Sequence, residues 1–169
     1  INDLEYKLAN WYGMEKALIH TSALDANIGV LSALGRKLPE AIFISDEKNH
    51  ASIIDGIRTS KASKLIFKHN NLTDLENKLK GIRGISDSRA IIIVIESVYS
   101  MEGDIAPIKE IIRLKDKYNA FLFVDEVHAC GMYGERGSGY CEQLGVTKQV
   151  ELICGTFGKA LGSLGGYVV

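Results

Sequence analysis

Polar residues follow directly after four short apolar runs of this sequence. They lie at 46–52 (DEKNHAS), 96–104 (ESVYSMEGD), 125–131 (DEVHACG) and 155–166 (GTFGKALGSLGG). Because the carboxyl ends of parallel strands open onto one crevice, we expect these segments to meet there. Together they would bring carboxylates, two histidines, hydroxyls and a lysine to one place.

Asp125 and Lys159 are the two residues of this set whose surroundings favour chemistry. Asp125 ends an apolar run, so its carboxylate would lie partly desolvated at the floor of the crevice. Lys159 lies in a glycine-rich stretch where backbone can approach a bulky ligand, and a desolvated lysine can attack a carbonyl carbon. Pyridoxal 5′-phosphate (PLP) needs such an amine, a carboxylate at its ring nitrogen and donors at its phosphate. His128 and Thr156 are close enough in sequence to contact the same ligand.

Each of these residues also has a structural interpretation. A lysine after a strand is most often a solvated surface residue, and an acidic residue in that position is often a helix cap. A hydroxyl there more often makes the hydrogen bonds of a turn or cap than it binds a ligand. His20 and His69 lack partners in the sequence pattern and are expected to be structural, and Tyr99 and Tyr133 are expected to be packing residues. The residue types alone leave both interpretations open for Lys159, Asp125, His50, His128, Ser100 and Thr156.

The segment 125–128 (DEVH) also matches the D-E-x-H box of nucleic-acid-dependent NTPases. A phosphate loop of the form G-x-x-x-x-G-K-[ST] ending around Lys159 fails, because Ile153 takes its first glycine position and Ala160 its Ser/Thr position. The acidic box also precedes the lysine, which reverses the expected order. The four histidines and three cysteines show no ligand spacing, so no metal site is predicted.

Composition limits the possible partners. The 169 residues are 46% hydrophobic and 24% charged with a formal net charge of −1, which fits one domain or most of one. Basic residues are not clustered, so neither nucleic acid nor a membrane surface is an expected partner. Cys130, Cys141 and Cys154 form no C-x-x-C pair, which favours a reducing compartment, the cytoplasm or, in a eukaryote, the mitochondrial matrix. A helical pattern at Ile1 and an apolar end at 167–169 indicate that the sequence is a piece of a longer chain.

The elements that must position these residues alternate between strand-length apolar runs and segments of helical period. This pattern predicts an α/β fold with a mostly parallel sheet flanked by helices. Thr73 and Glu76 match a capping box, and Pro107 suits the first turn of a helix. With only two prolines, no internal domain boundary is predicted. The expected strands are 41–45, 64–67, 90–95, 120–125 and 151–154, and the expected helices are 3–11, 27–38, 52–61, 73–82 and 108–118.

Four motifs in series resemble the α-oxoamine synthases. They are NHASIIDGI at 49–57, ESVYSMEGDIAP at 96–107, DEVHACG at 125–131 and GTFGKALG at 155–162. These synthases are PLP enzymes of the aspartate-aminotransferase fold, and the similarity covers nearly the whole sequence in the right order. It implies that residues 1–169 are part of a PLP-dependent transferase large domain, without an N-terminal segment and a C-terminal small domain. It also implies a homodimer with its active site at the subunit interface, acting on an amino acid and an acyl-CoA.

The resemblance implies a role for each site residue. His50 would stack on the cofactor ring and Asp125 would pair with the ring nitrogen. Lys159 would hold the cofactor as a Schiff base and, once displaced, remove the α-proton of the amino acid. The carbanion would attack the thioester, CoA would leave, and in most members decarboxylation follows. The remaining contacts would come from Ser100 and His128 at the phenolic oxygen and from Thr156 at the phosphate.

Within the segment Ser22-Ala23-Leu24 the sequence keeps the serine of the family pattern and departs from it at Ala23 and Leu24. Many members have Ser-Gly and an aromatic residue there, with backbone N–H groups on the phosphate at a helix N-terminus. Alanine fits if its φ is negative, whereas loss of the aromatic residue alters the cofactor pocket.

The motifs divide between members of the family. LGRKLP at 34–39, the 96–107 motif and HACGMYG at 128–134 look most like members that use glycine and succinyl-CoA. DAN at 25–27, SIIDG at 52–56 and GKALG at 158–162 lean toward members that use other acyl-CoAs. A non-catalytic partner subunit is the alternative of another class. Such subunits typically lack the lysine, so Lys159 argues against this alternative.

Overall fold

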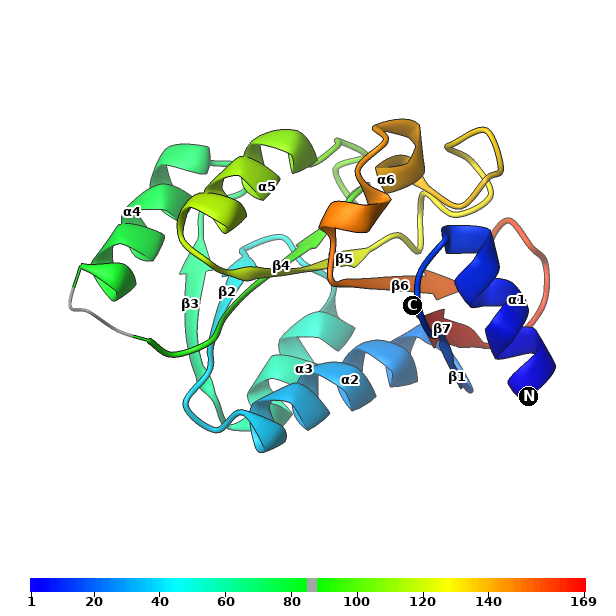
Figure 1. The fold of residues 1–169 in the computed structure, drawn as a ribbon, viewed down its shortest axis with the longest axis horizontal. Coiled ribbons are helices and arrows are strands. Elements are labelled where there is room, and N and C mark those ends of the chain that lie inside the picture. Colours follow the sequence, from blue (N-terminus) through cyan, green and yellow to red (C-terminus); the bar gives the residue numbers. More distant parts are fainter. Residues whose placement is uncertain (85–87) are drawn as a thin grey trace.

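The computed structural model describes residues 1–84 and 88–169 (Figure 1). In this part of the chain a seven-stranded sheet has the order β1-β7-β6-β5-β4-β2-β3. The strands are β1 (Leu18–His20), β2 (Ile42–Asp46), β3 (Ser63–Phe67), β4 (Ile91–Glu96), β5 (Phe121–Asp125), β6 (Leu152–Thr156) and β7 (Gly166–Val168). The helices are α1 (Asn2–Tyr12), α2 (Ala23–Lys37), α3 (Ala51–Ser60), α4 (Leu72–Arg83), α5 (Ile108–Lys117) and α6 (Tyr140–Gln143), with a 3-10 turn at Thr147–Gln149.

The five strands from β2 to β6 pair in parallel, whereas β7 pairs antiparallel with both β6 and β1. Every residue of β2 and β4 is buried, as expected for parallel strands that are covered on both faces. The predicted α/β class, with a mostly parallel sheet flanked by helices, is therefore confirmed.

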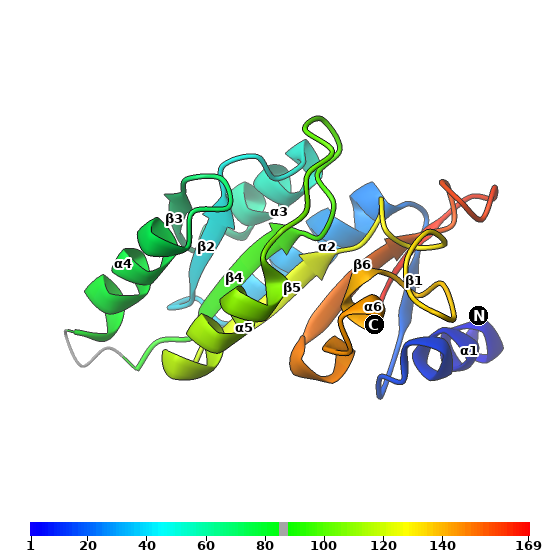
Figure 2. The same cartoon turned by 90° about the horizontal axis from the view of Figure 1, so that it is seen from above.

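Helices cover both faces of the sheet. Figure 1 shows α2 and α3 below it and α4, α5 and α6 above it, and Figure 2 shows α1 beside β1 at the opposite end from α4. Two buried clusters match these layers. Leu31 and Ile53 belong to the cluster under α2 and α3, while Leu75 and Ile111 belong to the cluster under α4 and α5.

The predicted elements are all present, with different ends. The largest difference is at α2, which starts at Ala23 instead of residue 27 because the Ser22 side chain accepts a hydrogen bond from the Asp25 backbone N–H at 3.0 Å. β1, β7 and α6 were not predicted. They have three or four residues each, too few to show a hydrophobic period.

The predicted capping box of Thr73 and Glu76 is wrong. α4 begins one residue earlier, and its N-cap is Asn71, whose side chain accepts from the Asp74 N–H at 2.9 Å. Glu76 instead binds Lys117 at 2.7 Å. Asparagine is a stronger N-cap than threonine, which accounts for the earlier start. Pro107 is the N-cap of α5 and lies just before its first turn.

Gly56 allows α2 and α3 to pack closely. A Cβ atom at Gly56 would lie 2.9 Å from the Asn27 carbonyl oxygen and 3.1 Å from the Ile28 Cα. Both neighbours are backbone atoms of α2, so the helix itself would have to move. Gly81 in α4 is a natural comparison, because a Cβ there would meet nothing within 4 Å.

Substitution of Gly56 tests this packing. Gly56→Ala is expected to lower the free energy of unfolding by about 1–3 kcal/mol, the usual cost of overpacking. Gly81→Ala is expected to raise it by about 0.5–1 kcal/mol, because alanine restricts the unfolded chain and favours helix. Urea unfolding of both variants measures the two effects. Equal stability of the two would contradict the close packing at Gly56.

Candidate functional site

A cavity of about 500 Å³ lies beyond the carboxyl ends of β2, β4, β5 and β6, a size typical of small-molecule sites. Ser22, which was predicted to bind the cofactor, does not line it. The Ser22 hydroxyl donates to the Asp25 carboxylate at 2.8 Å while capping α2. The predicted residues that do line the cavity are Ala23, Leu24, His50, Ser100, Asp125, His128, Thr156 and Lys159.

Asp125 lies at the floor of this cavity and is only 4% exposed. Its carboxylate accepts from Asn27 Nδ2 at 2.7 Å and from the Val127 backbone N–H at 2.8 Å. Burial raises the pKa of Asp125, and these hydrogen bonds oppose the rise. These two hydrogen bonds use only part of the carboxylate's roughly four lone-pair sites, and both donors are neutral, so Asp125 can still pair with a cationic ligand.

A chain of hydrogen bonds joins Asp125 to His50. Asn27 Nδ2, which donates to Asp125, also donates to Ser52 Oγ at 3.0 Å, and Ser52 Oγ lies 2.8 Å from His50 Nδ1. His50 is also the N-cap of α3, since its Nδ1 accepts from the Ser52 N–H. Asn27 and Ser52 were not predicted as site residues. For Asn27, the signal in the sequence was an amide at a position of the helix that is expected to be buried.

Glu96 was also missed as a site residue, although it ends β4 inside a predicted motif. It lines the cavity, is 2% exposed, and lies next to Asp125 in the sheet register. Burial, and then the charge of Asp125, raise the pKa of Glu96 to about 8. Its Oε1 accepts from the His50 backbone N–H at 2.6 Å, and its Oε2 lies 3.9 Å from His128 Nδ1. Glu96 therefore fixes the backbone at His50, a candidate cofactor-binding residue, and lies close to His128, a second one.

Lys159 is exposed and lies on the loop that joins β6 to β7. Within residues 1–84 and 88–169, its ammonium group has no hydrogen bond or ion pair. Lys159 lines the same cavity as His128, whose pKa is lowered by burial and then by the charge of Lys159. Thr156 secures the loop, because its hydroxyl donates to the Gly165 carbonyl at 3.1 Å and accepts from the Gly158 N–H at 3.0 Å.

The position of Glu126 argues against the NTPase interpretation of the DEVH segment. It is fully buried, and its carboxylate accepts from Ser97 Oγ and from the N–H groups of Tyr140 and Cys141. The carboxylate therefore fixes the start of α6 and does not line the cavity. The second acidic residue of the DEVH segment is structural.

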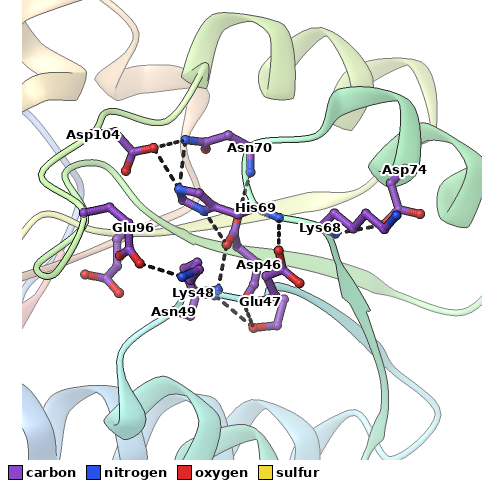
Figure 3. A network of polar contacts seen from close by, with 12 residues as sticks. Asp46, Glu47, Lys48, Asn49, Lys68, His69, Asn70, Asp74, Glu96 and Asp104 are labelled. Atoms are coloured by element: carbon purple, nitrogen blue, oxygen red, sulfur yellow. Dashed lines mark hydrogen bonds and ion pairs between the residues drawn. The ribbon is translucent and has the colours of Figure 1, made fainter.

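The expectation that His69 lacks partners is wrong. Figure 3 shows its ring between two carboxylates, with Nδ1 2.8 Å from Asp46 and Nε2 2.8 Å from Asp104. The ring also meets the buried Tyr99 edge-on at 4.4 Å, which confirms Tyr99 as a packing residue. Asp46 ends β2, whereas Asp104 lies in the turn that carries Ser100. His69 thus ties the Ser100 turn to the sheet.

Other parts of the described chain offer less chemistry. Its three cysteines are all free and buried. Among residues 1–84 and 88–169, no group of three His, Cys, Asp or Glu side chains could hold a metal ion. No helix in this part of the chain has the length and apolar character required to cross a membrane.

Comparison with known proteins identifies the family. The model of class I and II aminotransferases matches residues 1–169. The chain belongs to this family. It is 52% identical to the mitochondrial 5-aminolevulinate synthase of Schizosaccharomyces pombe over 166 residues, covering 98% of this chain and 29% of that relative. It is 51% identical to the 5-aminolevulinate synthase of Rhizobium meliloti over 166 residues, covering 98% of this chain and 40% of that relative.

Solved structures of the family have the same fold. A serine palmitoyltransferase variant from S. paucimobilis with a bound PLP–myriocin aldimine has a TM-score of 0.91 and 36% identity, covering 99% of this chain and 41% of that one. The 8-amino-7-oxononanoate synthase of Francisella tularensis has a TM-score of 0.81 and 30% identity, covering 98% and 46%. The predicted resemblance to α-oxoamine synthases is confirmed. The chain spans 29% to 40% of the length of the two curated relatives.

The two carboxylates that contact His69 are expected to make the stability of the protein depend on pH. Burial lowers the pKa of His69, but its hydrogen bonds to Asp46 and Asp104 outweigh burial and raise it above the ordinary value of 6.5. Because the folded-state pKa is raised, the stabilisation by His69 is complete below a pH of about 6.5 and lost as pH rises through the folded-state value. His69→Gln is therefore expected to lower the melting temperature most at mildly acidic pH.

His20 is the matched control, because burial lowers its pKa. As pH falls, His69→Gln should become more destabilising relative to the unsubstituted protein. Over the same change in pH, His20→Gln should become more stabilising relative to the unsubstituted protein. Thermal unfolding across pH 5.5 to 8.5 measures both. A melting-temperature loss in His69→Gln that is constant over this range would contradict the charged pairing.

Proposed function

We propose that this chain is part of the PLP-binding large domain of a longer transferase, with an N-terminal segment and a C-terminal small domain outside residues 1–169. The observation that carries the proposal is the presence of Asp125 and Lys159 on one cavity of about 500 Å³. PLP requires a carboxylate and an amine, and this cavity offers the buried Asp125 carboxylate and a Lys159 ammonium group that has no partner among the described residues.

The donor set fits PLP at each of its polar groups. Asp125 would accept from the protonated ring nitrogen, and His50 would stack on the ring. The first turn of α2, with Ala23 and Leu24 on the cavity, offers backbone N–H groups for the phosphate. Thr156 would hold the Lys159 loop by accepting from the Gly158 N–H, and its hydroxyl would contact the phosphate by turning its proton away from the Gly165 carbonyl. Ser100 and His128 would lie near the phenolic oxygen.

PLP bound here would supply an electron sink for a carbanion at the amino acid Cα. The residues of this chain do the rest. Asp125 would keep a proton on the ring nitrogen, because an adjacent carboxylate favours the cationic ring. Lys159 Nζ would attach the cofactor and, after displacement by substrate, accept the α-proton. His128 and Ser100 would orient the ring. His50 would exclude water from the ring face on which it stacks.

The substrates we propose are an amino acid and an acyl-CoA, joined to form an α-oxoamine. The best-supported member is 5-aminolevulinate synthase, which condenses glycine with succinyl-CoA and loses CO₂, because the two curated relatives compared above carry that name. The alternatives are 2-amino-3-ketobutyrate CoA ligase and 8-amino-7-oxononanoate synthase. Assays of glycine with succinyl-, acetyl- and pimeloyl-CoA, and of alanine with pimeloyl-CoA, distinguish the three.

Homodimerisation, with the partner subunit completing the active site, is part of the same proposal. A cytoplasmic location, or the mitochondrial matrix in a eukaryote, agrees with the bacterial and mitochondrial names of the relatives. A non-catalytic partner subunit is the competing class. Lys159 weighs against it, because such subunits typically lack the lysine that holds the cofactor.

Replacement of Lys159 tests the proposed function. In the full-length protein, borohydride treatment with PLP is expected to attach the cofactor covalently to Lys159, and Lys159→Ala is expected to abolish both this attachment and at least 99% of the turnover, since removal of a covalent catalyst typically costs more than about 100-fold. Peptide mass spectrometry locates the modification. Lys37→Ala, at the exposed end of α2, is the control and should retain both. Attachment elsewhere, or none in the unsubstituted protein, would contradict the proposal.

A further inference from the structure

Asn27 is a buried polar side chain for which the proposed function has given no role. It lies one turn into α2, is 1% exposed and lines the cavity. Its Nδ2 donates to Asp125 Oδ2 at 2.7 Å and to Ser52 Oγ at 3.0 Å. Both hydrogen atoms of one amide nitrogen are therefore used on residues of the candidate site.

The other half of the Asn27 amide lacks a partner. Its Oδ1 is buried without a hydrogen bond to any residue in the ranges 1–84 and 88–169. An unsatisfied buried acceptor destabilises a fold, and an apolar side chain of the same shape would avoid that cost. The two N–H donors are thus the reason for an amide at this position. The isosteric aspartate would instead place a second carboxylate against Asp125.

The contacts of Asn27 link two groups that belong to different elements. Asp125 ends β5, whereas Ser52 lies in the first turn of α3 and contacts His50 Nδ1 at 2.8 Å. Gly56 allows α3 to lie against the Asn27 backbone, which keeps Ser52 within reach of the Asn27 amide. One amide therefore contacts the carboxylate that would pair with the ring nitrogen and, through Ser52, the imidazole that would stack on the ring.

We propose that Asn27 is a positioning residue that keeps the Asp125 carboxylate ionised and directed at the PLP ring nitrogen, and that fixes His50 over the same ring through Ser52. The inference rests on the proposed function. An ionised Asp125 leaves the shared proton on the ring nitrogen, and the Asn27 donor stabilises that arrangement because a hydrogen bond to a charged acceptor is stronger than one to a neutral acceptor. Without it, the proton shifts toward the carboxylate.

The test uses the full-length protein and PLP labelled with ¹⁵N in its ring. Asn27→Leu removes both donors and keeps a similar volume. The ring ¹⁵N resonance is expected at the position of a protonated pyridine in the unsubstituted protein and to move toward that of neutral pyridine in Asn27→Leu. The Kd for PLP should rise by about 10- to 100-fold, the loss expected for a hydrogen bond to a charged group.

Two further variants separate positioning from a general loss of stability. Leu31→Val removes buried volume from the same helix away from the cavity, so it should lower the melting temperature and leave the ¹⁵N resonance unchanged. Ser52→Ala breaks only the branch toward His50, so it should weaken PLP binding while the ring nitrogen stays protonated.

The outcomes distinguish the two proposals. An unshifted resonance in Asn27→Leu with a Kd changed less than about twofold, or an equal shift in Leu31→Val, would overturn the role of Asn27 while PLP binding by the unsubstituted protein still supports the proposed function. Failure of the unsubstituted protein to bind PLP would overturn the proposed function and this inference with it.

Discussion

The burial of the Asp125 carboxylate is the constraint on which the rest of the site depends. A carboxylate loses much of its hydration when only 4% of the residue remains exposed, and burial accordingly raises its pKa. Two neutral donors, the Asn27 amide and the Val127 N–H, recover part of that loss. A cation in the cavity would recover more, because an opposite charge at close range favours the ionised form. The fold thus maintains a carboxylate whose natural partner is a cationic ligand.

The parallel sheet brings the partners of Asp125 to the same edge. His50, Glu96 and Thr156 follow or end neighbouring strands, so residues that are far apart in sequence line one cavity. The loops that carry the candidate cofactor-binding side chains are held by contacts outside the cavity. His69 holds the Ser100 turn through two carboxylates, and Thr156 holds the Lys159 loop through Gly165. The candidate cofactor-binding residues therefore lie on backbone that is held by hydrogen bonds and ion pairs, as a preorganised site requires.

The sequence predicted residues that line the cavity better than it predicted the residues that support them. Asp125 and Lys159 could be found because each follows an apolar run that reads as a strand, and strand order then places them together. The partners of Asn27 and His69 could not be predicted, because they are distant in sequence: Asn27 is 98 residues from Asp125, and His69 is 35 from Asp104. The cap at Asn71 and the three-residue strands were missed for a local reason, since competing caps and very short elements leave no periodic signal.

The most direct measurement of this account is a crystal structure of the full-length protein with PLP. The account predicts that the ring nitrogen lies within hydrogen-bonding distance of the Asp125 carboxylate, that density joins Lys159 Nζ to the cofactor, and that Asn27 still donates to Asp125. A cofactor seated outside this cavity, or a ring whose nitrogen faces away from Asp125, would contradict it.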